Sequence, residues 1–168
     1  SIDYVDIVGV SKGDIERGGL EAGVLAELRE VNTLLHVVRV FADDSIPHVN
    51  ESVDARRDIE TIDLEFAFAD LQIIDKRVER ISRELRTQKV LTLEKERTVL
   101  ERCKGFLERG IALREIDVSP EDARMIQGYR FLTQKPMLLI CNIGEEQLDQ
   151  AEEIRSNFAE YEQKPQTE

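Results

Sequence analysis

Aromatic residues are scarce in this sequence, and tryptophan is absent. Aromatic residues make up 5% of the 168 residues, whereas hydrophobic residues as a whole make up 41%. Aromatic side chains are enriched in strands, so a core built mainly on Leu, Ile and Val favours a helix-rich protein. The length allows one ordinary domain, or one domain with an arm.

Cysteine is nearly absent as well, and long apolar runs do not occur. Cys103 lies in a helical pattern and Cys141 in an apolar run, so we expect two buried free thiols in a reducing compartment, not a disulfide or metal site. No run of 18 apolar residues is found, which argues against a transmembrane helix. The first ten residues lack the basic segment of a secretory signal, so we expect a cytoplasmic location.

A net positive charge is missing from most of the chain. The net charge is −12, which argues against wholesale wrapping by nucleic acid or docking on anionic lipid. The exception is residues 76–104, where ten Lys or Arg and five Glu give +5, so that the remainder carries −17. Such a stretch suits either a solvated helix face or a surface that binds RNA phosphates, and the residues leave both readings open.

The apolar pattern changes period along the chain. Residues 2–10 predict a buried strand, 20–31 a helix, and 33–41 an internal strand that is apolar on both faces, which together form a βαβ unit. Near the C-terminus, residues 135–146 predict another buried strand and 148–161 an acidic helix.

Two helices are predicted in the middle of the chain. Apolar residues three and four apart indicate a helix with a seam for a partner helix, at Leu64, Ala67, Leu71, Ile74, Val78, Ile81 and Leu85. A second stripe ends near Gly110, and it consists of Leu93, Leu100, Cys103 and Leu107. We expect the two helices to pack as an antiparallel hairpin with a turn near residues 87–89. Ser119 and Pro120 then predict the start of a further helix.

Short polar motifs follow two of the predicted strands. Asp6-x-x-Gly9 ends the first strand, and Asn142-x-x-Glu145 ends the last one. Ligands of open α/β sheets bind beyond the carboxyl ends of strands, and a glycine there lets its backbone N–H approach a phosphate. An Asn can bind the Hoogsteen edge of a purine, but Ile143 and Glu145 depart from the Asn-Lys-x-Asp guanine motif. Each motif alone is common, and their joint occurrence predicts a nucleotide site.

Longer stretches carry a specific resemblance. "VDIVG" is followed by "KG" at 12–13, then by "LREVNTLLHVVRVFADDSIPHV", "VDARRDIETID" and "FLTQKPMLLICNIGE". In this order they resemble the YchF (EngD, Obg-like ATPase) family of P-loop NTPases over nearly the whole chain. The resemblance implies an α/β fold, namely a partial Ras-like P-loop NTPase sheet with an inserted antiparallel helical hairpin, a coiled coil. Residues 1–52 and 131–168 would belong to the nucleotide-binding domain, and 53–130 would form the arm.

The resemblance also implies roles for single residues. Asp6 would hold Mg²⁺ through water and Gly9 would donate to the γ-phosphate. Switch II would include Val10, Lys12 and Gly13. The base would be contacted by Asn142, Ile143 and Glu145, in a pattern that goes with ATP, GTP being less favoured.

Catalysis is expected to depend on His48. Val10 stands where typical GTPases place a water-orienting Gln, and a valine cannot orient water. His48 matches a family histidine, and a neutral imidazole can align or accept from the attacking water, although a plain surface histidine is an equal alternative. Departures from the family pattern at Pro47, and in switch II at Arg17, Glu21 and Ala22, put the mobility and competence of the switch in question.

No G-x-x-x-x-G-K-[ST] motif occurs in the sequence. The family's P-loop lies upstream of its Asp-x-x-Gly strand, so we expect a piece of a longer ribosome-associated ATPase, which alone binds ATP poorly and hydrolyses it negligibly. The arm would meet a ribosome or RNA through Lys76, Arg77, Arg80, Arg83, Arg86 and Lys89. Two alternatives remain open, a helical-hairpin interaction module without NTPase role and a catalytically dead homologue.

Overall fold

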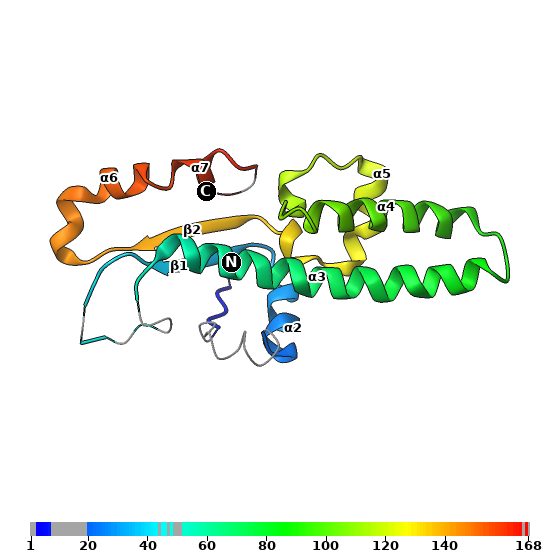
Figure 1. Cartoon of the computed structure of the whole chain (residues 1–168), viewed down its shortest axis with the longest axis horizontal. Helices are drawn as coiled ribbons and strands as arrows, with labels where there is room; N and C mark the ends of the chain where they lie inside the picture. Colours follow the sequence, from blue (N-terminus) through cyan, green and yellow to red (C-terminus); the bar gives the residue numbers. More distant parts are fainter. Residues whose placement is uncertain are drawn as a thin grey trace. The chain divides into compact units, whose positions relative to one another are not determined.

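A computed structural model describes residues 3–7, 20–43, 45–46, 48, 52–165 and 167 of the chain. The chain forms two compact units, which we call unit 1 (Ser1–Glu65 and Pro136–Glu168) and unit 2 (Phe66–Lys135). Helix α3 (Ala55–Leu85) contributes residues to both units. Figure 1 shows the elements in sequence colours.

The sheet of unit 1 has two parallel strands within the described residues. Strand β1 (Leu34–Arg39) pairs with β2 (Met137–Asn142), from Leu34 opposite Met137 to Arg39 opposite Asn142. The strands lie close to where the sequence predicts them, because β-branched residues crowd this part of the chain. One face is buried through Leu34 and Val38, but the other is exposed, so the prediction of a strand covered on both faces is wrong.

The first predicted strand is also wrong over its described part. Residues 3–7 have no regular secondary structure, and the side chains of Tyr4 and Val5 are 77% and 54% exposed. A strand requires a neighbour that pairs with its N–H and C=O groups, and apolar residues alone do not provide one. Asp6 therefore does not end a strand of this sheet.

Short helices complete unit 1. Helix α2 (Ala22–Glu30) lies where expected, and the Leu20 N–H donates to Glu65 of α3 at 3.2 Å. The acidic helix predicted for 148–161 is instead divided into η4 (Glu145–Gln150), α6 (Ala151–Ser156) and α7 (Ala159–Glu162). A small core forms where α7 and α3 meet β1, and its buried residues are Val38, Ala55, Ile59 and Tyr161.

Helices α3 and α4 (Leu91–Leu107) run along each other in unit 2 (Figure 1). Their apolar stripes form one buried cluster with the segment that follows, comprising Ile74, Ile81, Val99, Leu100, Cys103, Leu107, Leu113, Ile126 and Phe131. Leu64 does not share in it, because this predicted seam residue is largely exposed. Gly110 ends the α4 region with φ +73°, a conformation that favours glycine.

The rest of unit 2 covers this cluster. The short helices are η1 (Leu113–Glu115), α5 (Pro120–Ile126), η2 (Gln127–Tyr129) and η3 (Leu132–Gln134). As predicted, Ser119 caps α5, with its hydroxyl accepting from the Asp122 N–H at 3.1 Å. Asp70 of α3 is fully buried, and its carboxylate accepts from the Leu132 N–H, the Thr133 N–H and the Thr133 hydroxyl at 3.1, 2.9 and 2.8 Å.

Both cysteines are free thiols, as expected. Cys103 is buried in unit 2, but Cys141 on β2 is only half-buried, and burial raises the pKa of each thiol. Among the helices that the structure describes, none has the length and apolar character needed to cross a bilayer.

Candidate functional site

The carboxyl ends of β1 and β2 bring two polar residues side by side. Arg39 and Asn142 are register partners at the last position of each strand, and beyond them the Val40 N–H donates to the Asn142 carbonyl at 2.8 Å. Parallel strands present their carboxyl ends at one edge, which is where open α/β sheets bind ligands. We call this edge of the sheet the carboxyl edge.

Arg39 holds the segment that follows β1. Its guanidinium donates to the carbonyls of Phe41, Asp43 and Ile46 at 3.0, 3.0 and 2.9 Å, and it lies 4.4 Å from the centre of the Phe41 ring. The Asp43 carboxylate in turn accepts from the N–H and hydroxyl of Ser45. These hydrogen bonds hold the pKa of Asp43 below its ordinary value. The segment leading to His48 is thereby tied to the carboxyl edge.

His48 contacts the first turn of α3. Its Nε2 lies 3.1 Å from Oδ2 of Asp58, and the two side chains are 14% and 18% exposed. Oδ1 of Asp58 accepts from Nε and Nη2 of Arg57 at 3.2 and 3.0 Å. Arg57 also donates to the hydroxyl and carbonyl of Ser52, so the chain on both sides of His48 is held by an arginine.

The turn after β2 is closed by its own hydrogen bonds. The Gly144 N–H donates to the Gln147 side chain at 2.9 Å, and the Gln147 N–H donates back to the Gly144 carbonyl at 3.0 Å. Asn142 and Glu145 have exposed side chains on either side of this turn, and Ile143 is half-buried. Asn142 and Glu145 are therefore accessible to a ligand at the carboxyl edge.

Four of the predicted phosphate-binding and switch residues, Gly9, Val10, Lys12 and Gly13, lie outside the described residues. Asp6 is described and exposed. No group of three His, Cys, Asp or Glu side chains suited to a metal ion occurs among the described residues. One exposed carboxylate does not form a metal site, although Mg²⁺ in nucleotide sites takes most of its ligands from phosphates and water.

The basic residues of the arm are not equivalent. Arg77 donates to Glu96 through Nε and Nη2 at 2.7 and 2.8 Å, so its guanidinium is paired with a carboxylate inside unit 2. Arg80 and Arg83 form ion pairs one turn away on α3, with Glu84 and Glu79. Lys76, Arg86 and Lys89 are exposed, and none forms an ion pair with a described residue.

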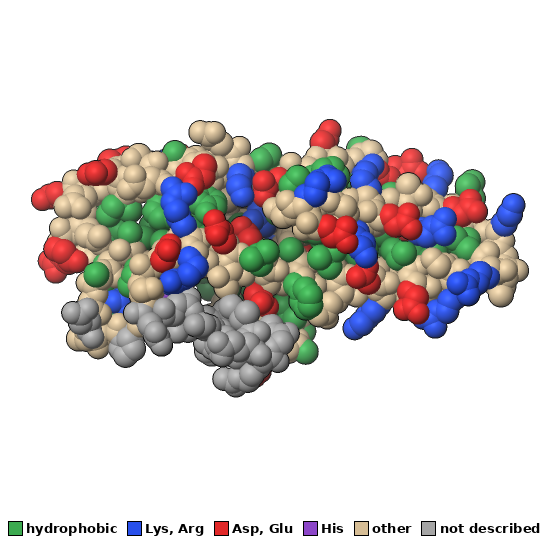
Figure 2. Space-filling view, viewed as in Figure 1, with side chains coloured by type: hydrophobic (Ala, Val, Ile, Leu, Met, Phe, Trp, Pro, Cys, Tyr) green, Lys and Arg blue, Asp and Glu red, His purple; other side chains and the backbone are tan. Residues whose placement is uncertain are grey.

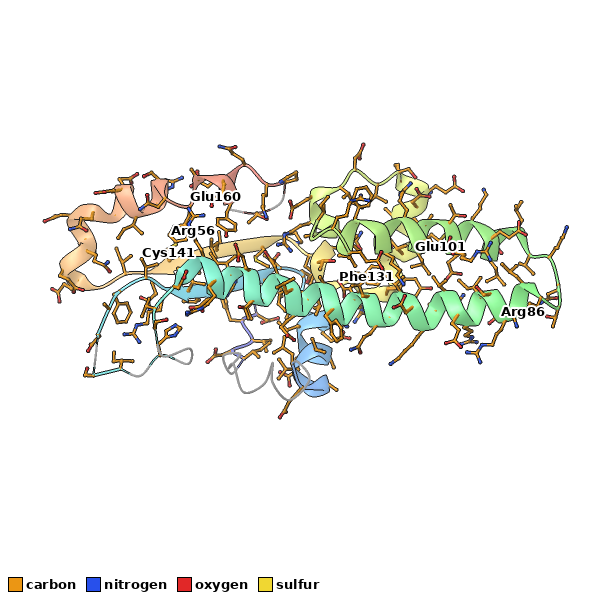
Figure 3. The ribbon with its side chains drawn as sticks, in the orientation of Figure 1. Arg56, Arg86, Glu101, Phe131, Cys141 and Glu160 are labelled. Carbon is orange, nitrogen blue, oxygen red and sulfur yellow. The ribbon has the colours of Figure 1, made fainter. Side chains whose placement is uncertain are left out.

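The end of the arm is therefore its most available basic surface. Arg86 lies where α3 turns into α4 (Figure 3), and Lys and Arg side chains gather at this end (Figure 2). Exposed Leu91 lies beside the turn.

Sequence reasoning gave no role to Arg39 or Asp58. Arg39 is the one charged residue in the apolar run 33–41, and a lone arginine inside a predicted strand signals a specific partner. Asp58 falls within the quoted stretch "VDARRDIETID", on the first turn of a helix that follows the His48 segment. Neither signal identifies the partner, which only the folded chain supplies.

Comparison with known proteins gives one consistent result. The chain is 34% identical over 148 residues to "Ribosome-binding ATPase YchF" of Bacillus subtilis (strain 168), a match covering 88% of this chain and 40% of that protein. For the protein of the same name from Escherichia coli O157:H7, the identity is 36% over 160 residues, with 92% and 44% covered. A solved structure, "Structure of the Schizosaccharomyces pombe YchF GTPase", superposes with TM-score 0.71 at 28% identity, covering 88% of this chain and 41% of that one.

The chain thus spans about two fifths of the length of the curated relatives that it matches. No family model matches the sequence.

Proposed function

We propose that the chain forms part of a ribosome-associated P-loop NTPase. It belongs to the YchF family, since the matches to YchF proteins cover 88% or more of its length. In this proposal the longer protein hydrolyses ATP, with GTP as the weaker substrate. Unit 1 is then part of a Ras-like sheet, and α3 and α4 form a coiled-coil arm inserted in it. The shared sequence is the observation that carries the proposal.

The carboxyl edge supports a nucleotide site. Asn142 ends β2 and Glu145 follows it, and both are exposed. Asn142 would bind the purine, and Glu145, with Ile143 in the lysine position, would favour adenine over guanine. Asp6 would hold Mg²⁺ through water, and Gly9 would donate to the γ-phosphate, with Val10, Lys12 and Gly13 in switch II. His48 would align the attacking water, and its imidazole contacts Asp58.

The end of the arm supports a contact with ribosomal RNA. Of the six basic residues predicted for the arm, Lys76, Arg86 and Lys89 are exposed and form no ion pair with a described residue, so they are the ones we expect to contact phosphates. Arg80 and Arg83 would join them by exchanging their glutamate partners for phosphate. Arg77 contributes mainly to holding α3 against α4.

ATP turnover tests the enzymatic part. We would compare the 168-residue chain with the protein extended to the length of its relatives, including a P-loop. The extended protein should hydrolyse ATP faster than GTP, and His48→Ala should lower kcat while ATP affinity is kept. The short chain should be inactive. An extended protein that binds neither nucleotide would contradict the proposal and favour a catalytically dead homologue.

Ribosome co-sedimentation at two salt concentrations tests the arm. Arg86→Gln combined with Lys89→Gln should weaken binding and reduce its salt dependence, because fewer counterions are released. Glu101→Gln on α4 is the control for a charge change elsewhere on unit 2. If ribosome binding is the same at both salt concentrations and is unchanged by the double substitution, the arm makes no phosphate contact.

A further inference from the structure

The contact between His48 and Asp58 determines more than the place of the imidazole. An ionised carboxylate can only accept hydrogen bonds, so the ring nitrogen that faces it, Nε2, must carry a proton. In a neutral imidazole only one nitrogen is protonated, and the basic lone pair is then on Nδ1. The contact therefore distinguishes the two tautomers of His48.

The carboxylate is itself held in one orientation. Arg57 donates two hydrogen bonds to Oδ1, while the imidazole contacts Oδ2. Asp58 lies on the first turn of α3, whose next turn carries Ile59 in the buried core of unit 1. Asp58 is thus fixed by a rigid element, whereas His48 comes from the segment between β1 and α3.

We propose that Asp58 is a positioning residue for His48, an inference that rests on the proposed function. Asp58 selects the Nε2–H tautomer and makes Nδ1 the nitrogen that accepts from the attacking water. As water attacks the γ-phosphorus, its proton passes to Nδ1, and the bond between phosphorus and the bridging oxygen breaks with its electron pair on ADP. The imidazolium formed donates through Nε2 to the Asp58 carboxylate.

Nitrogen-15 NMR of the 168-residue chain tests the tautomer without any enzymatic assay. The sequence has two histidines, so His36 serves as an internal reference. At a pH where imidazoles are neutral, His48 should give the shifts of an Nε2–H ring. In Asp58→Asn the amide can donate to Nε2, and the proton should move to Nδ1, whereas Glu60→Gln should change nothing. A wild-type His48 protonated at Nδ1, or an unchanged ring in Asp58→Asn, would overturn the inference.

Kinetics of the extended protein supply the second test. Asp58→Asn should lower kcat by about tenfold to hundredfold while KM for ATP is kept, as expected for loss of base alignment. Asp58→Glu should recover part of the rate, and Glu60→Gln is the control for lost charge on α3. Thermal unfolding of each variant shows whether it is folded.

The two failures are distinguishable. If the extended protein hydrolyses no ATP, the proposed function fails, and the NMR result still decides the tautomer. If it hydrolyses ATP and Asp58→Asn has wild-type kcat, the positioning role of Asp58 is wrong and the proposed function stands.

Discussion

The two units differ in how much of their apolar surface is buried. Unit 2 encloses nine buried side chains in one cluster, and even its buried carboxylate, Asp70, has backbone and hydroxyl donors around it. Among its described residues, unit 1 has a buried cluster of four residues and a two-stranded sheet with one exposed apolar face. A two-stranded sheet has little stability of its own.

The candidate functional side chains follow this difference. His48 and the residues beyond β2 lie in unit 1, at loops and strand ends, while unit 2 offers cations on a rigid helical support. Ligand-binding segments are drawn from regions with few buried contacts, because such regions can rearrange at low cost. We therefore expect substitutions in unit 2 to change stability most and substitutions on the open face of unit 1 to change it least.

Removing the Asp70 carboxylate should have the largest effect on stability. Asp70→Ala leaves the Leu132 N–H, the Thr133 N–H and the Thr133 hydroxyl without their buried acceptor. Each such loss is costly, so we expect a decrease of about 4 kcal/mol in the free energy of unfolding. Urea denaturation followed by circular dichroism measures it.

Asp75→Ala is the matched control for Asp70. Asp75 lies one and a half turns further along α3 and pairs with Lys104 at 2.6 Å, but both groups are substantially exposed. An exposed pair contributes little to stability, so Asp75→Ala should cost far less than Asp70→Ala. Equal losses of unfolding free energy in the two variants would mean that the buried hydrogen bonds of Asp70 do not stabilise unit 2 more than an exposed ion pair does.

Leu100→Ala should be the next most damaging substitution. Leu100 is fully buried at the centre of the unit 2 cluster, and truncation of such a leucine costs about 3 kcal/mol through lost transfer energy and a residual cavity. Leu91→Ala, at the exposed start of the same helix, should cost little. A similar midpoint in urea for both variants would contradict the closed core.

These contrasts also show what the sequence could predict. The periods of the apolar residues located β1, β2, α2 and both long helices, and Ser119 with Pro120 located the start of α5. Such signals are local. Residues 3–7 looked like a strand by the same measure, but a strand depends on a partner that its own residues do not specify.

The candidate site divides along the same line. Asn142 could be placed at the end of a strand from the apolar run before it. The contacts of Arg39 and Asp58 could not be predicted from the sequence. Each of these contacts joins a charged side chain to a segment whose path is set by the fold. Asp70 was likewise unremarkable in sequence, since nothing local distinguishes a buried aspartate on a helix from a solvated one.

The network around Glu96 should make unit 2 sensitive to acid. Hydrogen bonds from Arg77 hold the pKa of Glu96 below its ordinary value of 4.5, burial opposes this, and the Tyr129 hydroxyl lowers it further. A carboxyl with a lowered folded-state pKa stabilises the fold above its unfolded pKa and loses this contribution as the pH falls. Stability should therefore decrease below about pH 4.5.

Glu96→Gln tests this network. It should cost about 1 to 2 kcal/mol near neutral pH, because the carboxylate is mostly buried and accepts charged hydrogen bonds, and it should flatten the acid part of the stability curve. Glu101→Gln, on the exposed side of α4, is the control. If the stability of Glu96→Gln falls with decreasing pH as steeply as that of the wild type, Glu96 is not the cause of the acid sensitivity.

The smallest effect is expected on the open face of the sheet. Val37 and Val38 are neighbours on β1, but their side chains are 59% and 3% exposed because successive residues point to opposite faces. Val→Thr keeps the shape and the β-branching and replaces one methyl group by a hydroxyl. Val37→Thr should change the free energy of unfolding by less than about 0.5 kcal/mol, as is usual for exposed sites. Val38→Thr should cost about 2 kcal/mol, since it buries a polar group. If Val37→Thr is as costly as Val38→Thr, the face is covered in solution and unit 1 is as closed as unit 2.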